Sequence, residues 1–282
     1  MTPLVQSGRI SLFAGYADLN TGSDSSKNQA DYSLRSHGGL LGVRARANSK
    51  LTLGFFAGID SGTADATYLN STITGNAFGL FGVYTPKADG RLVATASVTA
   101  GDYKAHGTRA TASGTSVFNH VDSTDYVGQV GVKYLAVRTP DYYLQPELQL
   151  VYNHAETDHF NETNAADALQ ALHVAGISAP GVHLNAAVNG GYALTDSLGL
   201  TANLGVSQDL DHAYRKVSAN VIGESTVFSV RAPGMGTTQI NVGVGANYSL
   251  TPQLVLRASY EAGFSSDAKT SSSFFIGTAL SF

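Results

Sequence analysis

The sequence predicts an all-β fold, a 12-stranded antiparallel transmembrane β-barrel of the bacterial outer membrane. Three observations support this: strand-like alternation along the whole chain, few charges without any long apolar run, and connections that alternate between short and long. Charged residues make up 13% of the chain, against roughly 25% in an ordinary soluble domain. No stretch approaches the roughly 20 consecutive apolar residues of a spanning helix, so the apolar content lies at alternate positions, as in membrane strands.

Alternation is clearest between Leu144 and Tyr152, where Leu, Pro, Leu, Leu and Tyr share one face while Gln, Glu and Gln share the other. In a soluble sheet the apolar face would turn inward and the exterior would be rich in Lys and Glu, which this chain is not. We therefore expect the apolar face to meet lipid and the polar face to line a lumen. The pattern predicts strands at 8–19, 36–47, 51–66, 74–85, 91–107, 116–137, 142–158, 169–194, 198–219, 224–249, 254–264 and 272–282.

The connections predict which end of the barrel faces outward. Short turns are expected at 48–50, 86–90, 138–141, 195–197 and 251–253. Long polar connections are expected at 20–35, 67–73, 108–115, 159–168, 220–223 and 265–271. In bacterial outer-membrane barrels the short turns are periplasmic and the long loops extracellular, and we expect the same orientation here.

Tyrosines near the predicted strand ends indicate two aromatic belts, where rings lie at the lipid headgroups. One belt precedes the short turns and the other lies near the opposite strand ends. The first comprises Tyr84, Tyr134, Tyr192 and Tyr248, and the second Tyr16, Tyr152 and Tyr260. Tyrosine is common in strands generally, but that enrichment would scatter the residues along the strands.

Composition and motifs exclude several classes of function. The chain has no cysteine for disulfides or thiolate ligands, and a net charge of −4 gives no basic surface for nucleic acid. The segment from His154 to His159 resembles a metal cluster, but its ligands lack a convergent fourth partner. Nucleophile-elbow and phosphate-loop motifs are absent from the sequence. We expect no catalytic residues, no metal and no cofactor.

The polar face is the best candidate for a functional surface. The polar side chains on this face either hold a chain in transit or pair with one another across neighbouring strands. We favour pairing for most of the charged side chains. Glycines on the same face, such as Gly42, Gly54 and Gly277, leave room for a helix or peptide or else ease curvature. The predicted lumen-lining residues are Arg44, Arg46, Arg91, Gln129, Lys133, Gln145, Glu147, Gln149, Asn185, Asn203, Asn241, Asn247, Arg257 and Glu261.

The last strand has one large apolar face and ends on an aromatic residue. Phe274, Ile276, Leu280 and Phe282 lie on that face. Such a strand would be an aggregation-prone edge unless it closes a barrel by pairing with the first strand.

The order and spacing of several segments resemble the C-terminal translocator domain of type Va autotransporters. The resemblance covers nearly the whole chain. The matching segments are the Gly-rich pair 37–43 and 51–58, the Pro-containing strand 142–152, the loop 158–164, and the closing segments 216–231, 243–245 and 254–260 with terminal Phe282. No single one of these motifs is diagnostic.

The resemblance implies a barrel that anchors a covalently linked N-terminal passenger, absent from this chain, and assists its passage to the cell surface. It also implies that Phe274, Ile276, Leu280 and Phe282 form a signal read by the outer-membrane barrel assembly machinery. We expect residues 8–282 to form the barrel, in contact with outer-membrane lipid, as a monomer.

The N-terminus departs from the family pattern. We expect residues 1–7 to be a short remnant of the linker and the chain to be a processed or excised fragment, since no signal sequence precedes the first strand. Family members usually carry a helix that lies in the lumen before the first strand, whereas only about seven residues precede the first predicted strand here. The Asn-Asn pair of the self-cleaving subgroup is also not visible, so intramolecular cleavage of the passenger is not supported.

Two alternatives remain open from the sequence. One is a passenger-less outer-membrane pore. The other is a barrel hydrolase, which needs a Ser/His or Asp/His constellation at the outer rim.

Overall fold

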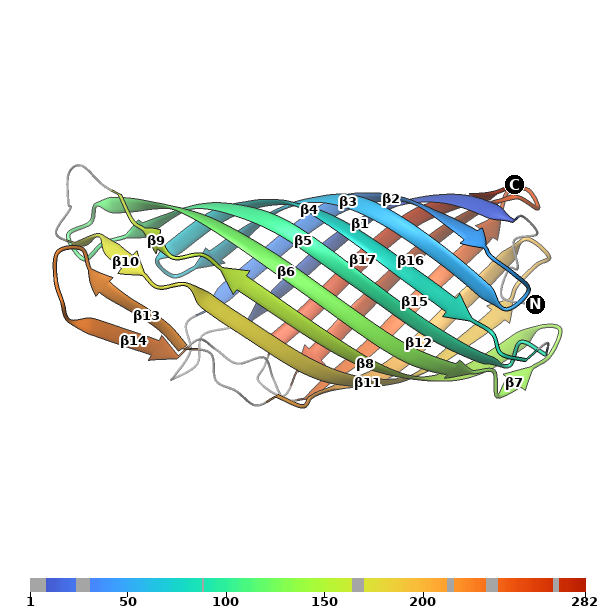
Figure 1. The fold of residues 1–282 in the computed structure, drawn as a ribbon. Coiled ribbons are helices and arrows are strands. Elements are labelled where there is room, and N and C mark those ends of the chain that lie inside the picture. Colours follow the sequence, from blue (N-terminus) through green and yellow to red (C-terminus); the bar gives the residue numbers. More distant parts are fainter. Residues whose placement is uncertain are drawn as a thin grey trace.

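The computed structural model describes residues 9–23, 31–87, 89–163, 170–211, 216–231, 238–265 and 269–282, and it forms a closed antiparallel β-barrel (Figure 1). Within these residues, no helix is long and apolar enough to cross a membrane. The barrel strands are β1 (Ile10–Ser23), β2 (Tyr32–Arg46), β3 (Leu51–Ala66), β4 (Leu69–Tyr84), β5 (Leu92–Ala110), β6 (Ser116–Tyr134), β8 (Tyr142–Thr157), β11 (Ile177–Ala193), β12 (Leu198–Asp209), β15 (Thr238–Ser249), β16 (Leu254–Ser265) and β17 (Lys269–Ser281). The predicted fold class is confirmed.

Two pairings close the ring. The first and last strands, β1 and β17, pair from Ser11↔Ser281 onward, and β8 pairs with β11 from Ile177↔Thr157 to Tyr192↔Tyr142. The described sheet has 13 strands because it also includes β7 (Val137–Arg138), a short strand that pairs only with β8. Without β7, twelve strands remain in the ring, and no barrel edge is left unpaired.

The large apolar side chains lie on the outside of the barrel. Cross-strand partners share a face, so the register carries the outward set from strand to strand. Leu41 and Ile59 on this face are 64% and 68% exposed, values expected of side chains that contact lipid. The largest fully buried side chains among the described residues are only Val117 and Val255. The barrel is therefore held by its closed ladder and its inner face rather than by an apolar core.

Several strands run further from the short turns than the sequence predicts. β3 and β4 pair as far as Ala66↔Leu69, so the predicted long connection at 67–73 is wrong and only Thr67 and Tyr68 join the strands. The outward residues here, including Thr72 and Thr74, are polar. The apolar alternation used to assign strands therefore ends before the hydrogen-bonded ladder does.

A second sheet of four short strands stands at the end of the barrel opposite the C-terminus (Figure 1). Its order is β14-β13-β10-β9, formed by β9 (Phe160–Asn161), β10 (Leu172–Val174), β13 (Lys216–Val221) and β14 (Val227–Arg231). The predicted strands 169–194, 198–219 and 224–249 each merged one of these with a barrel strand. Alternation reports the strand period but not the sheet to which a strand belongs.

Candidate functional site

All seven predicted belt tyrosines are exposed on the outer face. Tyr84, Tyr134, Tyr192 and Tyr248 lie at or within two residues of strand ends next to short connections. Tyr16, Tyr152 and Tyr260 lie at the other margin of the apolar band, where Tyr126 joins them. On β4 the outward positions beyond this margin become polar, as at Thr72 and Thr74, whereas Phe264 of β16 is still apolar. Two rings of tyrosine around an apolar band match the arrangement expected at both membrane interfaces.

The terminal strand presents its apolar face outward. Phe274, Ile276, Leu280 and Phe282 are all exposed there. The backbone amide of Phe282 donates a 2.9 Å hydrogen bond to the carbonyl oxygen of Ile10, so the final residue still belongs to the β1–β17 ladder. Its ring therefore lies at the level of the tyrosines that precede the short turns.

The register places the predicted lumen residues on the inner face of seven strands, with Arg91 just before β5 in phase with the inward positions. Those on strands are Arg44, Arg46 (β2), Gln129, Lys133 (β6), Gln145, Glu147, Gln149 (β8), Asn185 (β11), Asn203 (β12), Asn241, Asn247 (β15), Arg257 and Glu261 (β16). Their role in holding a chain stays a prediction.

One sector of the inner wall, from β6 to β16, is a polar network. Lys133 Nζ lies 3.0 Å from Glu147 Oε1, and Asn189 Nδ2 donates to Glu147 Oε2 at 2.9 Å. Asn189 was not among the predicted residues, although it occupies an inward position of its strand. This ion pair confirms the expected cross-strand pairing for these two charges.

Amide side chains extend the polar sector. Gln149 Nε2 donates to Gln129 Oε1 at 2.9 Å, and Asn185 Nδ2 donates to Gln149 Oε1 at 3.3 Å. On the next strands Asn203 Nδ2 donates to Glu261 Oε2 at 3.3 Å. The Oδ1 atoms of Asn185 and Asn203 are buried and accept no hydrogen bond within the described protein. These two oxygen atoms are thus packed within the wall without a partner.

The opposite sector, from β17 through β1 to β4, is lined by phenylalanine rings that lie over glycines of neighbouring strands. A Cβ on Gly42 would collide with the ring of Phe13, and one on Gly54 with the ring of Phe81. Phe275 covers Gly277 of its own strand and also Gly15 of β1. Of the two alternatives for Gly42, Gly54 and Gly277, room for a peptide is therefore excluded, because rings fill the space. The inner wall is therefore aromatic on one side and polar on the other.

Basic side chains gather toward the short-turn end of the lumen. Arg44 and Arg46 of β2 lie within electrostatic reach of one another, and Arg257 of β16 is close enough to act on Arg44. Arg46 and Arg257 face inward and are nevertheless exposed, so the lumen is open to solvent at their level.

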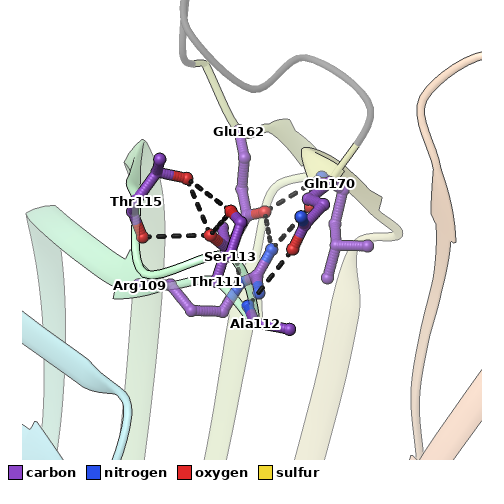
Figure 2. Close-up of polar contacts among 8 residues, drawn as sticks. Arg109, Thr111, Ala112, Ser113, Thr115, Glu162 and Gln170 are labelled. Carbon is purple, nitrogen blue, oxygen red and sulfur yellow. Dashed lines mark hydrogen bonds and ion pairs between the residues drawn. The ribbon is translucent and has the colours of Figure 1, made fainter.

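A buried ion pair beyond the outer belt joins the small sheet to the barrel (Figure 2). Arg109, at the end of β5, binds Glu162 with two hydrogen bonds, Nε to Oε1 at 2.7 Å and Nη2 to Oε2 at 2.6 Å. Glu162 is 4% exposed and also accepts a bond from the backbone amide of Leu172. The Glu162 carboxylate raises the pKa of Arg109, which stays charged.

Sequence reasoning missed this pair. Arg109 Nη2 also donates to the carbonyl oxygen of Gln170, whose Oε1 accepts from the amide of Ala112. Beside them Thr111, Ser113 and Thr115 form a hydroxyl cluster (Figure 2). Arg109 at the end of β5 and Glu162 just after β9 are 53 residues apart in the chain, and no periodicity links them.

The segment examined as a metal cluster does not converge. His154 Nε2 lies 2.9 Å from Glu156 Oε1, while the His159 ring packs 6.0 Å, centroid to centroid, from that of His173. Across the described part of the chain, no group of three or more His, Cys, Asp or Glu could hold a metal ion.

Comparisons with known proteins agree with this architecture. The model of the autotransporter beta-domain family matches residues 10–261. The translocator domain of autotransporter NalP from Neisseria meningitidis superposes with a TM-score of 0.81 at 17% identity, covering 98% of this chain and 89% of that one. The transport unit of AIDA-I from Escherichia coli gives 0.72 at 13% identity, covering 100% and 93%. The beta domain of the Bordetella autotransporter BrkA gives 0.72 at 15%, covering 97% and 100%. No curated protein is a significant match.

Proposed function

Because the chain belongs to the autotransporter beta-domain family, we propose that this barrel conducts its N-terminally linked passenger along the lumen, in contact with the polar sector of β6–β16. The domain is a non-enzymatic outer-membrane translocator for passenger secretion. The family assignment thereby decides against the barrel hydrolase. What is proposed here is the route of the passenger and the residues along it.

The proposal rests on the position of Ile10, the first residue of β1. β1 begins at the short-turn end of the barrel, beside Phe282. A passenger joined to this end starts on the short-turn side of the membrane. Because the ladder is closed, its only path to the other side is through the lumen. In the proposed orientation the short turns face the periplasm, and the small sheet faces the cell exterior.

The chemistry of the lumen fits such a passage. A polypeptide in transit carries backbone N–H and C=O groups that lose water when confined, and each needs a substitute partner. The amide side chains of Asn185 and Asn203 lie on the inner face beside Gln149 and Glu261, and such groups can bond both N–H and C=O groups of a passing chain. Lys133 and Glu147 neutralise one another, so this pair presents no net charge to hold the chain.

The proposal includes the remaining partners. Residues 1–7 lie outside the described residues and are assigned to the linker, with the barrel domain spanning 8–282. The outward face of β17, ending at Phe282, is assigned to recognition by the barrel assembly machinery. With its lipid-facing band continuous around a closed ring, the domain works as a monomer.

A surface-display experiment tests the route. A signal peptide and a reporter with a single cysteine are fused before residue 1, and the variant Asn203→Cys is introduced into the cysteine-free barrel. Arrested translocation intermediates should form a disulfide with position 203. The outward-facing variant Asn76→Cys is the matched control and should not form one.

A second experiment measures how much the amide side chains of Asn185 and Asn203 contribute to the rate of passage. The double variant Asn185→Leu/Asn203→Leu should slow the arrival of reporter at the surface several-fold, while Asn76→Leu should not. Barrel amounts in the outer membrane are matched by immunoblot. Efficient display without any cross-link to position 203 in arrested intermediates would disprove the luminal route.

A further inference from the structure

Two histidines face each other on the outer surface of the β5–β6 hairpin, beyond the aromatic belt. His106 of β5 and His120 of β6 are direct cross-strand partners. Their Nδ1 atoms are 3.2 Å apart, and their ring centroids 4.4 Å apart. Both residues are exposed. Two potential metal-ligating atoms therefore lie side by side on a rigid ladder.

The pair lies in water rather than in lipid. Tyr126 marks the belt on β6, and His120 is three outward positions further from the short turns. The outward neighbours between them are Asp122 and Thr124, and Lys104 lies directly opposite Asp122. An ion in the surrounding medium can reach both rings from the solvent.

The distance between the two Nδ1 atoms matches the distance between two ligand atoms of one metal ion. Imidazole nitrogens bind zinc at about 2.0–2.1 Å, which places two nitrogens of a tetrahedral site roughly 3.3–3.4 Å apart. An ordinary hydrogen bond between a protonated and an unprotonated Nδ1 also accounts for 3.2 Å. A metal ion would replace that shared proton without moving the strands.

A carboxylate behind one ring favours the metal interpretation. His120 Nε2 lies 3.5 Å from Asp122 Oδ2, on the side of the ring away from His106. Metal-binding histidines commonly donate their second N–H to a carboxylate, which fixes the tautomer with the other nitrogen free to coordinate. Here the Asp122 carboxylate is near enough to favour the tautomer with the proton on Nε2, which leaves the Nδ1 lone pair of His120 available to bind the ion. Lys104 opposes binding by its charge, but it faces Asp122.

We propose that His106 and His120 form a surface site for a divalent transition-metal ion of the zinc, copper and nickel class. The two Nδ1 atoms bind the ion, Asp122 orients His120, and water fills the remaining positions. The ligands are nitrogen atoms, which suit these ions better than magnesium or calcium. The site lies outside the lumen, so its failure would leave the luminal route of the passenger untouched.

Metal titration of the full chain in detergent micelles tests the site. The protein is purified without a polyhistidine tag, and zinc or copper chloride is titrated calorimetrically. One ion should bind per chain. His106→Ala and His120→Ala should each weaken binding at least tenfold, and Asp122→Asn should weaken it about 10–100-fold through loss of orientation.

Matched controls come from other histidines. His37 lies on the outer face of β2 opposite Asp18 and Ser61, and His173 belongs to the second ring pair. Neither His37→Ala nor His173→Ala should change the affinity. Copper bound to the unaltered chain should also show nitrogen superhyperfine splitting from two imidazoles in electron paramagnetic resonance. Undetectable binding, equal affinity in His106→Ala/His120→Ala, or a spectrum without two nitrogens would overturn the proposal.

Discussion

The hydroxyl oxygens of Ser11 and Ser281 lie 2.8 Å apart across the seam where the two ends of the barrel meet. The residues are 270 positions apart in the chain, and both are buried. Because Ile10 and Phe282 exchange a backbone hydrogen bond, the next pair inward, Ser11 and Ser281, is a non-hydrogen-bonded pair with close side chains. The seam is thus held by side chains as well as by its ladder.

The serine pair offers a direct test of closure. The double variant Ser11→Cys/Ser281→Cys should form a disulfide, because the Cα separation of such a pair, roughly 4.5 Å, lies within the range of natural disulfides. The chain has no other cysteine to compete. Oxidised protein should stay compact on a heated gel, and reduction should restore unfolding. Each single variant should behave as the unaltered protein, and failure to cross-link would show that this register is wrong.

Deleting Phe282 should impair assembly more than stability. Removal takes away one outward ring and one ladder bond at the barrel rim, while the seam from Ser11↔Ser281 onward remains. The amount of barrel inserted in the outer membrane should fall several-fold. Protein refolded in detergent should unfold at nearly the same temperature. Equal membrane levels of deleted and intact forms would rule out the signal role of this residue.

Adding a side chain to Gly42 should destabilise the barrel. The Cβ of Gly42→Ala collides with the ring of Phe13, and overpacking of this kind costs about 1–3 kcal/mol. Denaturant unfolding in detergent measures the loss. Phe13→Ala in the same chain should recover part of it. Gly128→Ala is the control, because a Cβ there meets no atom within 4 Å, and it should leave the unfolding midpoint unchanged.

Breaking the Arg109–Glu162 pair should release the small sheet while the barrel persists. Arg109→Ala leaves a buried carboxylate without its partner, and such losses cost about 3–5 kcal/mol. Limited proteolysis at β9 and β10 should then be faster than in the unaltered protein. Arg109→Lys should retain part of the protection. Proteolysis that is unchanged in Arg109→Ala would mean that the β10–β13 ladder alone holds this region.

The barrel could be predicted from sequence because lipid imposes a simple rule on every spanning strand. Leu148, Leu150 and Tyr152 alternate with amides and a carboxylate because one face meets lipid and the other the lumen. This rule no longer applies beyond the outer tyrosine belt, where the strands leave the lipid. Beyond the belt the ends of β3 and β4 are polar on the outer face, as at Thr63 and Thr72, and mixed on the inner face, so their pairing depends on tertiary context rather than on period.

The sequence predicted which residues face the lumen, but only some of the contacts that they make there. Pairing was expected for most of the lumen charges in general, and Lys133 and Glu147 form one such pair. By contrast, the rings over Gly42 and Gly54 come from partners on neighbouring strands, and a single sequence does not show which aromatic residue faces which glycine. The role of Glu162 could not be predicted for the same reason, since its buried carboxylate pairs with Arg109 at the end of β5.

The ring of Phe275 gives the seam a further property. It projects from β17 against Gly15 of β1, so the junction between the first and last strands is covered from within by an aromatic side chain. Any lateral exit between these strands would have to break the ladder and displace this ring at the same time. A polypeptide inside the barrel is therefore confined to movement along the axis, and the lipid around the seam stays inaccessible to it.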